Sequence, residues 1–397
     1  MKTAKTTKAK ESGEKAPAFD KKEILEAAKG IASSRKICSN CLGRQFAHVS
    51  TGMTNRQRGE ILRGLLKDKE PATCEVCVNL FKKLGDHASA AEKKVKGYEF
   101  STFAVGTKLS GDLIVREEAL WEEAGIEYCE SIRSELNREV GKLVYDRIRK
   151  EVDEKKPDML IIINLEKDRI ELQIASIFIR GGYRKLVRGI PQTKWDMYTV
   201  TVEDVIAGPF MKATGGTGHA LHASGREDID AKCLDWRPFV LEIKEPKKRA
   251  VDLRKMKALI KKTKKAEVDG LVFAGKDEVV EVKSQRLDKS YRALVSFSKP
   301  VKAADLAKLA KLKGIVRQQT PTRVAHRRAD KVRRRRVKSV SWERVNNKSI
   351  ELQIKGEAGL YIKELVSGDN GRTTPSVAGL LDNPAVVIEL DVIRIWK

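Results

Sequence analysis

The stretch HASGREDIDAKCLDWRPFVLEIKE, residues 222–245, joins a loop crowded with acidic side chains to a strong strand signal. Asp228 lies in the loop, two residues after Arg226, and the apolar run that follows predicts a strand. A loop anchored on a strand can hold a carboxylate rigidly. An ionised carboxylate in a basic groove is a candidate nucleophile or base. The same acids could instead cap a helix or pair with Arg237 and Lys244, and the residues alone leave both interpretations open.

Beyond this loop, strand patterns alternate with helical patterns as far as the end of the chain. Several neighbouring strands have connections only as long as a turn, which favours antiparallel pairing. The fold class expected here is therefore α+β with a mixed antiparallel sheet, and not a doubly wound parallel one. We expect strands at residues 238–245, 270–275, 278–284, 291–298, 333–345, 348–359 and 385–396, and helices near 251–267 and 302–313.

Four of the six cysteines form the pairs Cys38-x-x-Cys41 and Cys74-x-x-Cys77, each on a turn. At this spacing, each pair can place two thiolates on one face of a tetrahedral Zn²⁺ ion. Four cysteine ligands leave no open position, so we expect one structural zinc ion, and no organic cofactor. A disulfide or a chance pairing of buried cysteines is the alternative. The remaining cysteines, Cys129 and Cys233, are expected to be unliganded.

A mixed α/β module surrounds and follows these cysteines. Its expected elements are helices at 22–36, 55–67 and 117–153 and strands at 98–109, 158–166 and 168–181. The next segment, GGYRKLVRGIPQTKWD, is rich in basic and turn residues, which suits a linker or an RNA-facing loop.

The formal charge of +25, from 80 Lys+Arg against 55 Asp+Glu, predicts a polyanionic partner, and nucleic acid is the first candidate. A spanning helix is excluded because the longest apolar run is only about five residues, at 159–163. The first 22 residues contain seven lysines and no apolar core of a secretory signal. They predict a disordered basic tail in a cytoplasmic protein.

The string SGREDID at 224–230, followed by RPF at 237–239, closely resembles the archaeal and eukaryotic family of stand-alone tRNA pseudouridine synthases that act on the T-arm. The resemblance continues through residues 182–195, 289–295, 320–337 and 358–376, and so covers most of the chain in order. The cysteine pairs and the stretch GDLIVREEALWEEAG are similar to the zinc-containing, THUMP-bearing RNA-binding region of that family. The sequence departs from the family pattern at 231–236.

The resemblance implies an isomerase that converts uridine to pseudouridine, with Asp228 attacking during cleavage of the glycosidic bond. Tyr291 matches the tyrosine of the base pocket, and Tyr361 matches a second tyrosine that contacts the substrate. Lys363 matches the basic residue that keeps the aspartate ionised, and Arg226 is placed to enter the gap left by a flipped base or to bind phosphate. If Tyr361 and Lys363 lie on a strand, both point into one site. Ordinary packing is the alternative for each tyrosine.

The dense basic cluster of residues 323–336 predicts a track for RNA phosphates, since like charges repel without a polyanion. The expected RNA-binding residues are Arg184, Lys185, Arg188, Arg323, Arg327, Arg328, Arg333, Arg334, Arg335 and Arg336. The Gly-rich string TGGTGH at 214–219 lacks the Lys-Ser/Thr ending of a phosphate loop, and His219 and His222 show no metal-ligand spacing.

Three parts of the chain are therefore expected: a tail at 1–22, an accessory RNA-binding domain at 23–185 and a pseudouridine synthase catalytic domain at 186–397. The zinc unit should lie at about 36–80 and a THUMP-like region at about 81–185. The resemblance implies that the partner is tRNA, without a guide RNA, and that positions 54 and 55 are modified. No membrane partner is expected, and the enzyme should be a monomer. The alternatives are a non-catalytic zinc-containing RNA-binding or RNA-processing protein and a zinc-ribbon transcription factor.

Overall fold

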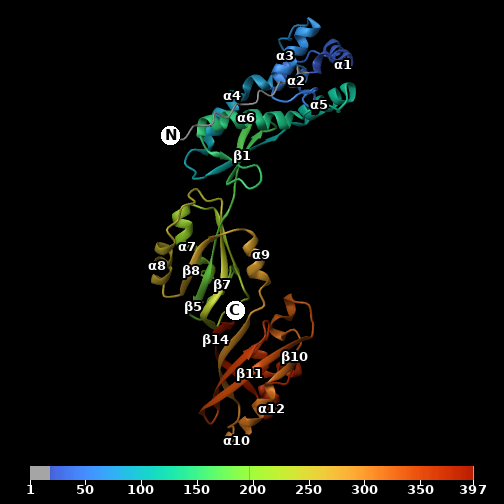
Figure 1. Ribbon diagram of the computed structural model, residues 1–397. Helices are drawn as coiled ribbons and strands as arrows, with labels where there is room; N and C mark the ends of the chain where they lie inside the picture. Colours follow the sequence, from blue (N-terminus) through green and yellow to red (C-terminus); the bar gives the residue numbers. More distant parts are fainter. Residues whose placement is uncertain (1–17, 196, 397) are drawn as a thin grey trace, which may run out of the picture. The chain divides into compact units, whose positions relative to one another are not determined.

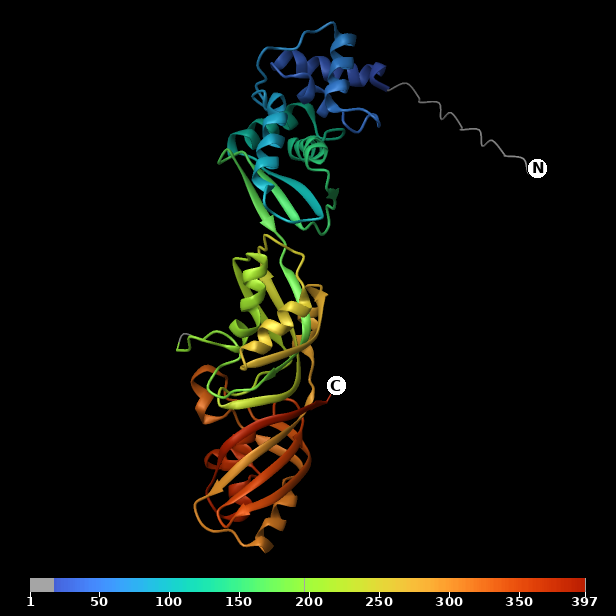
Figure 2. The same cartoon turned by 90° about the vertical axis from the view of Figure 1, so that its left-hand side faces the viewer.

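The computed structural model describes residues 18–195 and 197–396 and divides the chain into two compact units, 1–174 and 175–397 (Figures 1 and 2). The expected tail falls mostly on residues 1–17, which lie outside the described residues. The expectation is wrong for residues 18–22, because Phe19 is only 1% exposed and packs in an apolar core with Ile24. No helix in the described part of the chain is long and apolar enough to cross a membrane.

The first unit contains a helical part, with one apolar core around the cysteines, and a sheet with a second core. Thr54 and Gln57 form a capping box at the start of α3 (Asn55–Leu66). Each side chain accepts a hydrogen bond from the backbone N–H of the other residue. The helices are α1 (Lys22–Ser34), α2 (Ser39–Arg44), α3 (Asn55–Leu66), α4 (Leu84–Val95), α5 (Gly111–Ala124) and α6 (Ile132–Ile148).

The sheet of the first unit has the strand order β2-β1-β3-β4. β1 runs parallel to β2 and β3, whereas β3 and β4 are antiparallel. Apolar side chains of β1 and β3 pack against α4 and α6. The strands are β1 (Thr102–Lys108), β2 (Glu151–Val152), β3 (Met159–Asn164) and β4 (Arg169–Ile174).

The second unit is built on a ten-stranded sheet with the order β13-β10-β11-β12-β9-β14-β7-β5-β8, in which β6 pairs with β7. All these pairs are antiparallel except β14 with β7, so the expected α+β class with a mixed antiparallel sheet is confirmed. The strands are β5 (Ile177–Lys185), β6 (Gly218–Ala223), β7 (Ala231–Lys244), β8 (Ala266–Ala274), β9 (Asp288–Phe297), β10 (Gly314–Gln318), β11 (Arg333–Asn346), β12 (Ser349–Gly356), β13 (Thr373–Thr374) and β14 (Ala385–Trp396).

Helices lie on both faces of the β5 to β8 half of this sheet. α7 (Val202–Thr214) and α8 (Leu253–Lys262) pack on β6, β7 and β8, and α9 (Asp277–Ser284) lies on the other side of those strands (Figure 1). On the other half of the sheet, the short helices α10 (Ala303–Leu306), α11 (Ile362–Ser367) and α12 (Val377–Leu381) and the 3-10 helix η3 (Ala307–Leu312) belong to the same apolar core as β9 to β12. The opposite face of that half carries mainly polar side chains.

Three sequence-based expectations need correction. Residues 278–284, expected as a strand, lie in helix α9, and the long helix expected at 117–153 is two helices, α5 and α6. The strand expected at 168–181 is split between β4 and β5, which belong to different sheets, so the boundary falls at 174/175 and not at 185/186. Hydrophobic alternation identifies a strand, but the sheet that the strand joins depends on contacts with distant residues.

Candidate functional site

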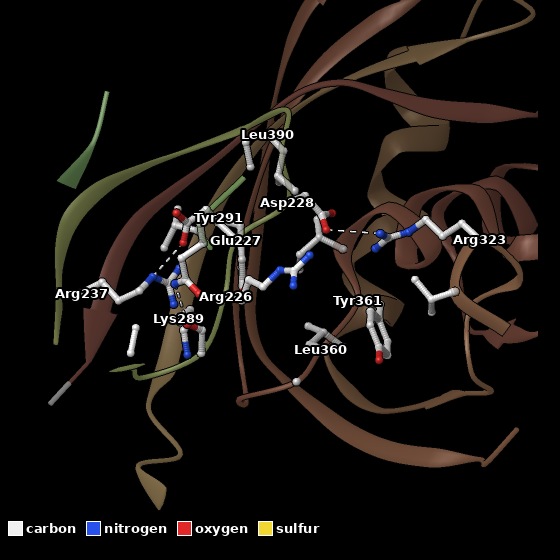
Figure 3. Close-up of a pocket in the computed structure, with 18 of the residues that line it drawn as sticks. Arg226, Glu227, Asp228, Arg237, Lys289, Tyr291, Arg323, Leu360, Tyr361 and Leu390 are labelled. Carbon is white, nitrogen blue, oxygen red and sulfur yellow. Dashed lines mark hydrogen bonds and ion pairs between the residues drawn. The ribbon is translucent and has the colours of Figure 1, made fainter. Parts of the chain in front are cut away.

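A loop between β6 and β7 brings Asp228 into a cavity of about 660 Å³, shown in Figure 3. The Asp228 side chain is 32% exposed, and one carboxylate oxygen lies 3.2 Å from Nη1 of Arg323. The other oxygen lies 3.7 Å from Nζ of Lys363. Asp228 is therefore placed between two cations, with an open path to solvent.

A buried ion pair supports the loop that carries Asp228. Glu227 and Arg237 are both fully buried, and Oε2 of Glu227 lies 3.0 Å from Nε of Arg237. Tyr183 donates its hydroxyl to Glu227 at 2.9 Å, and Gln192 donates to that hydroxyl at 2.6 Å and to the Gly225 carbonyl at 3.0 Å. Pairing of an acid with Arg237 was one of the two interpretations that the residues alone left open. Neither Tyr183 nor Gln192 was predicted to belong to the site.

We expect Glu227→Gln to lower the free energy of unfolding by roughly 3–5 kcal/mol, because it leaves the Arg237 guanidinium buried without a counter-charge. Thermal unfolding measures the loss. The matched control is Glu389→Gln, which breaks the ion pair with Arg188 at a carboxylate that is 59% exposed and should cost less than about 1 kcal/mol. Equal losses in both variants would contradict the supporting role of Glu227.

Two residues expected to bind RNA phosphates donate hydrogen bonds to backbone carbonyls of the loop that carries Asp228. Lys185 is 0% exposed and donates its ammonium to the carbonyls of Asp228 and Ile229, at 3.1 and 2.8 Å. The prediction that Lys185 binds phosphate is therefore wrong in this structure, because its charge is used inside the protein. Arg188 donates to the carbonyls of Asp230 and Leu390, at 3.1 and 2.6 Å, and has partial exposure.

Tyr291 forms part of the cavity wall from strand β9. Burial raises the pKa of its hydroxyl to about 12, so the phenol is neutral at ordinary pH. On the same face of β9 is Lys289, which is 7% exposed and donates to the Leu287 carbonyl at 2.9 Å. Sequence reasoning missed Lys289, although it lies two residues before Tyr291 on a strand, a spacing that places both on one face.

Burial lowers the pKa of Lys289 to about 8 from an ordinary value of 10.5. Between these two values the unfolded chain binds a proton that the folded chain does not, so stability rises with pH across this window. We expect the wild type to gain on the order of 2 kcal/mol relative to Lys289→Met between pH 7 and pH 10. Urea unfolding of both proteins measures the difference. A constant difference across this range would show that Lys289 is protonated in the fold.

Tyr361 and Lys363 reach the site from a helix start and not from the expected strand. Tyr361 precedes α11, where its backbone N–H donates to Oε1 of Gln318 at 2.9 Å. Its hydroxyl accepts a hydrogen bond from Arg328 at 3.0 Å. Lys363 lies on the first turn of α11. Its Nζ contacts the Asp228 carboxylate and lies 2.6 Å from Oδ2 of Asp230. The two residues are not on a strand, so the expectation that they share a strand face is wrong, but Lys363 contacts Asp228 and Tyr361 lines the same cavity.

The remaining predicted contact residues differ in their surroundings. Arg226 lines the cavity, is exposed and has no hydrogen-bond or ion-pair partner among the described residues. Arg323 bridges Asp228 and Glu364, at 3.2 and 2.7 Å, so it belongs to the site and not to a distant phosphate track. Arg327 is placed in the 3-10 helix Thr322–Arg327. His222 lines the cavity and contacts Glu242 at 3.1 Å.

The run Arg333–Arg336 does not form one surface. These residues lie on strand β11, where successive side chains point to opposite faces of the sheet. Arg333 and Arg335 lie on the helix-covered face, where Arg333 donates to the Thr320 hydroxyl at 2.8 Å. Arg334 and Arg336 are exposed on the other face. A dense cluster in the sequence is therefore divided between two sides of the sheet.

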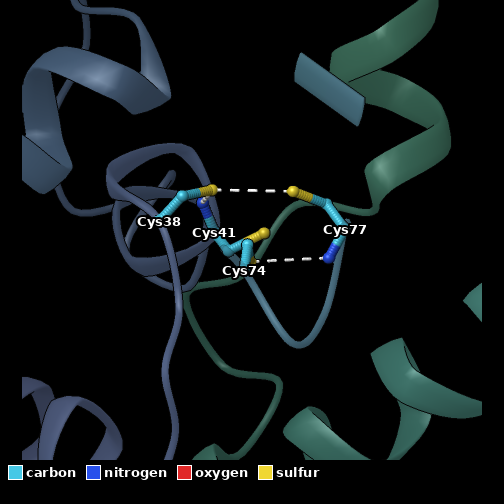
Figure 4. A group of neighbouring side chains, drawn as sticks. All are labelled: Cys38, Cys41, Cys74 and Cys77. Carbon is cyan, nitrogen blue, oxygen red and sulfur yellow. Dashed lines mark hydrogen bonds between the residues drawn. The ribbon is translucent and has the colours of Figure 1, made fainter. Parts of the chain in front are cut away.

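The first unit contains a candidate metal site. Cys38, Cys41, Cys74 and Cys77 are all buried, and their Sγ atoms lie within 4.8 Å of one another (Figure 4). Cys38 precedes helix α2, and its Sγ accepts the backbone N–H of Cys41 at 3.5 Å. The equivalent contact from Cys77 to Cys74 has the same length. Two similar turns thus face each other, and the four thiolates can hold a metal ion in a closed tetrahedral site.

The cysteine site is tied to the neighbouring helices by a buried arginine. Arg44 is 0% exposed, and its Nη1 lies 3.2 Å from Glu135 on α6 and its Nη2 lies 3.5 Å from Sγ of Cys41. Glu117 on α5 is 3.9 Å from the same guanidinium. A positive charge beside the cluster favours thiolate ligands. Loss of the cluster should therefore also disturb the packing of α5 and α6.

Comparisons with known proteins cover both units. Residues 178–395 match a family described as Pus10, C-terminal, and residues 87–164 match the Pus10 THUMP domain, archaeal. The protein named tRNA pseudouridine synthase Pus10 of Methanothermobacter marburgensis is 43% identical, over 96% of this chain and 100% of its own length. The proteins of the same name from Methanothrix thermoacetophila and Pyrococcus furiosus are each 38% identical over 94% of this chain. The matches cover 94% of the first protein and 98% of the second.

Proposed function

This chain belongs to the archaeal Pus10 family of tRNA pseudouridine synthases, and on that premise we propose that it isomerises uridines in the T-arm of tRNA, at the conventional positions 54 and 55. The observation that carries the proposal is the Asp228 carboxylate, which lies in a cavity between Arg323 and Lys363. In this proposal Asp228 is the nucleophile, and the reaction needs no organic cofactor.

The chemistry fits the groups that line the cavity. The bond between N1 of uracil and C1′ of ribose breaks while the carboxylate stabilises or bonds to the electron-poor sugar. The uracil turns and a bond forms between its C5 and C1′ as the carboxylate leaves C1′, which returns Asp228 to its free form. The proton lost from C5 is balanced by one gained at N1. The neutral ring of Tyr291 forms a wall against which the detached base can be held.

A uridine stacked in folded RNA must leave its stack to reach this cavity. Arg226 is exposed at the cavity and lacks a protein partner among the described residues, so its guanidinium is available to fill the gap or to bind a phosphate. Arg328 and Tyr361 are joined by a hydrogen bond of 3.0 Å at the same cavity. These residues serve substrate binding in the proposal.

The metal ion that suits the four-cysteine site is zinc, because four thiolates in a closed tetrahedral arrangement match its preferences. Such a site supports the fold of the first unit and takes no part in the reaction. We further propose that the enzyme acts as a monomer in the cytoplasm and selects its tRNA without a guide RNA.

The test of the proposed function uses an unmodified tRNA transcript incubated with the purified protein. Pseudouridine is mapped by carbodiimide treatment and primer extension. We expect stops at the T-arm uridines and none in a reaction without protein. Tight binding of tRNA with no pseudouridine at any position would favour a non-catalytic RNA-binding protein, whereas pseudouridine elsewhere would overturn only the proposed positions.

A further inference from the structure

The sheet of residues 175–397 has cations stacked on tryptophan rings on the face away from the cavity. The guanidinium of Arg184 lies 4.2 Å from the ring centre of Trp236. On β14, the ring of Trp396 has the Lys355 ammonium at 3.3 Å and the Arg394 guanidinium at 4.1 Å. These contacts form two cation–ring clusters, which no part of the proposed reaction uses.

Strand register places these clusters on the side opposite the cavity. Ser290 pairs with Lys355 on β12 and with Arg394 on β14, so the three side chains form a row across the sheet. Tyr291, the next residue on β9, points to the cavity, and neighbouring residues on a strand point to opposite faces. The row containing Lys355 and Arg394 is therefore on the back face of the sheet.

The two clusters are neighbours. The carboxylate of Asp235 accepts the backbone N–H of Trp236 at 2.8 Å and that of Ile395 at 2.7 Å, which ties the two tryptophan-bearing strands together. Trp236 on β7 lies beside Gly182 on the neighbouring strand β5. A Cβ atom added to Gly182 would lie 3.0 Å from the Trp236 Cβ. A side chain at that position would push the ring away from the sheet. The small residue thus allows the Arg184–Trp236 stack.

In the described part of the chain, aromatic rings, and not carboxylates, contact these cations. Among the described residues, Arg184, Lys355 and Arg394 form no ion pair with a carboxylate, in contrast to Arg292 on the same face, which is paired with Asp391 at 2.9 Å. An aromatic ring holds a cation by its quadrupole without neutralising it. Each cluster is therefore a fixed positive charge that remains available to an anion.

Further cations extend this surface toward the edge of the sheet. Arg317 pairs with Arg334 across β10 and β11, both are exposed, and neither forms an ion pair in the described part of the chain. Arg336 is exposed next to them, and among the described residues Glu357 is the only acid that contacts it, accepting its backbone N–H at 2.9 Å. We call this surface the back-face patch, and its members are Arg184, Trp236, Arg317, Arg334, Arg336, Lys355, Arg394 and Trp396.

We propose that the back-face patch is a second RNA-binding surface that takes the phosphate backbone of tRNA outside the T-arm. The proposal rests on the proposed function for the identity of the RNA. A row of cations that form no ion pair with a carboxylate among the described residues is complementary to a polyphosphate, whose binding releases condensed counter-ions. The ring-held side chains are already ordered, so fewer rotamers are lost when a phosphate binds.

The experiment measures the affinity of three double variants for full-length tRNA and for an isolated T-arm hairpin. Lys355→Gln with Arg394→Gln removes two charges from the patch. Lys355→Arg with Arg394→Lys keeps both charges, and Lys255→Gln with Lys262→Gln removes two exposed charges from α8, on the helix-covered face. Thermal unfolding of each variant checks that the fold is kept.

For the double variant Lys355→Gln with Arg394→Gln we expect about tenfold weaker binding of tRNA at low salt. The slope of log Kd against the logarithm of the salt concentration should fall by roughly one to two. Hairpin affinity should change by less than about twofold, and the charge-keeping pair should bind tRNA as the wild type does. Equal weakening by the α8 pair, equal weakening for the hairpin, or unchanged tRNA affinity would each overturn the proposal. Pseudouridine formation by the wild type is measured separately, so failure of the proposed function is distinguishable.

Discussion

Asp228→Asn should lower the single-turnover rate of pseudouridine formation by at least roughly four orders of magnitude, because an amide cannot attack or stabilise the sugar as a carboxylate does. The amide has the same shape and can still accept a hydrogen bond from Arg323, which lies 3.2 Å from the carboxylate. The loop should therefore keep its position. Affinity for tRNA should change by less than about threefold, since it depends mainly on phosphate contacts.

The matched control is Asp230→Asn, two residues away on the same loop. Asp230 also contacts Lys363, at 2.6 Å, but its side chain does not line the cavity. We expect this variant to lose less than about tenfold in rate, because it removes a charge partner and not the reacting group. Rates are measured with excess enzyme, so that binding and chemistry are separated. Activity above about 1% in Asp228→Asn, or an equal loss in both variants, would exclude Asp228 as the nucleophile.

Cys41→Ser should have the largest effect on stability. A structural zinc site contributes about 10–16 kcal/mol in small zinc domains, which is as large as the whole stability of an ordinary domain. Cys41 is fully buried, and it lies beside Arg44, whose charge would lose a neighbouring thiolate. We therefore expect loss of cooperative unfolding in residues 18–174 and loss of the one bound zinc ion. Circular dichroism and elemental analysis measure both.

Cys129→Ser is the control, because Cys129 lies outside the four-cysteine cluster and is only partly buried. It should keep the zinc content and the melting temperature of the wild type. Removal of the metal by a chelator under reducing conditions should reproduce the effect of Cys41→Ser. Stability that depends on an oxidant and does not change with a chelator would instead indicate a disulfide and would contradict the zinc proposal.

Part of this protein could be predicted from short stretches of its sequence. The two cysteine pairs predicted a four-thiolate site, and the four Sγ atoms do lie within 4.8 Å of one another. The alternation of apolar residues predicted most strands of the second unit and its α+β class. These features are local, because turn spacing and side-chain direction on a strand depend only on neighbouring residues.

The surroundings of Asp228 were decided by tertiary structure. Its partners Arg323 and Lys363 come from a 3-10 helix and a helix start far along the chain, and the sequence gives no measure of their distance. The ion pair of Glu227 and Arg237 beneath the loop is likewise a product of burial. Whether a charged side chain is a ligand or a support depends on how much water reaches it.

The positions of the basic residues show most clearly which features depend on the sequence and which on the tertiary structure. Lys185 belongs to a basic string but is buried against the loop that carries Asp228, and neighbours in the run Arg333–Arg336 point to opposite faces of the sheet. The sequence by itself determined the positive charge of +25, the strands, the cysteine turns and the motif around Asp228. Only the tertiary structure decided which charges meet, because the pairing of distant strands and the packing of helices on the sheet determine which side chains share a surface.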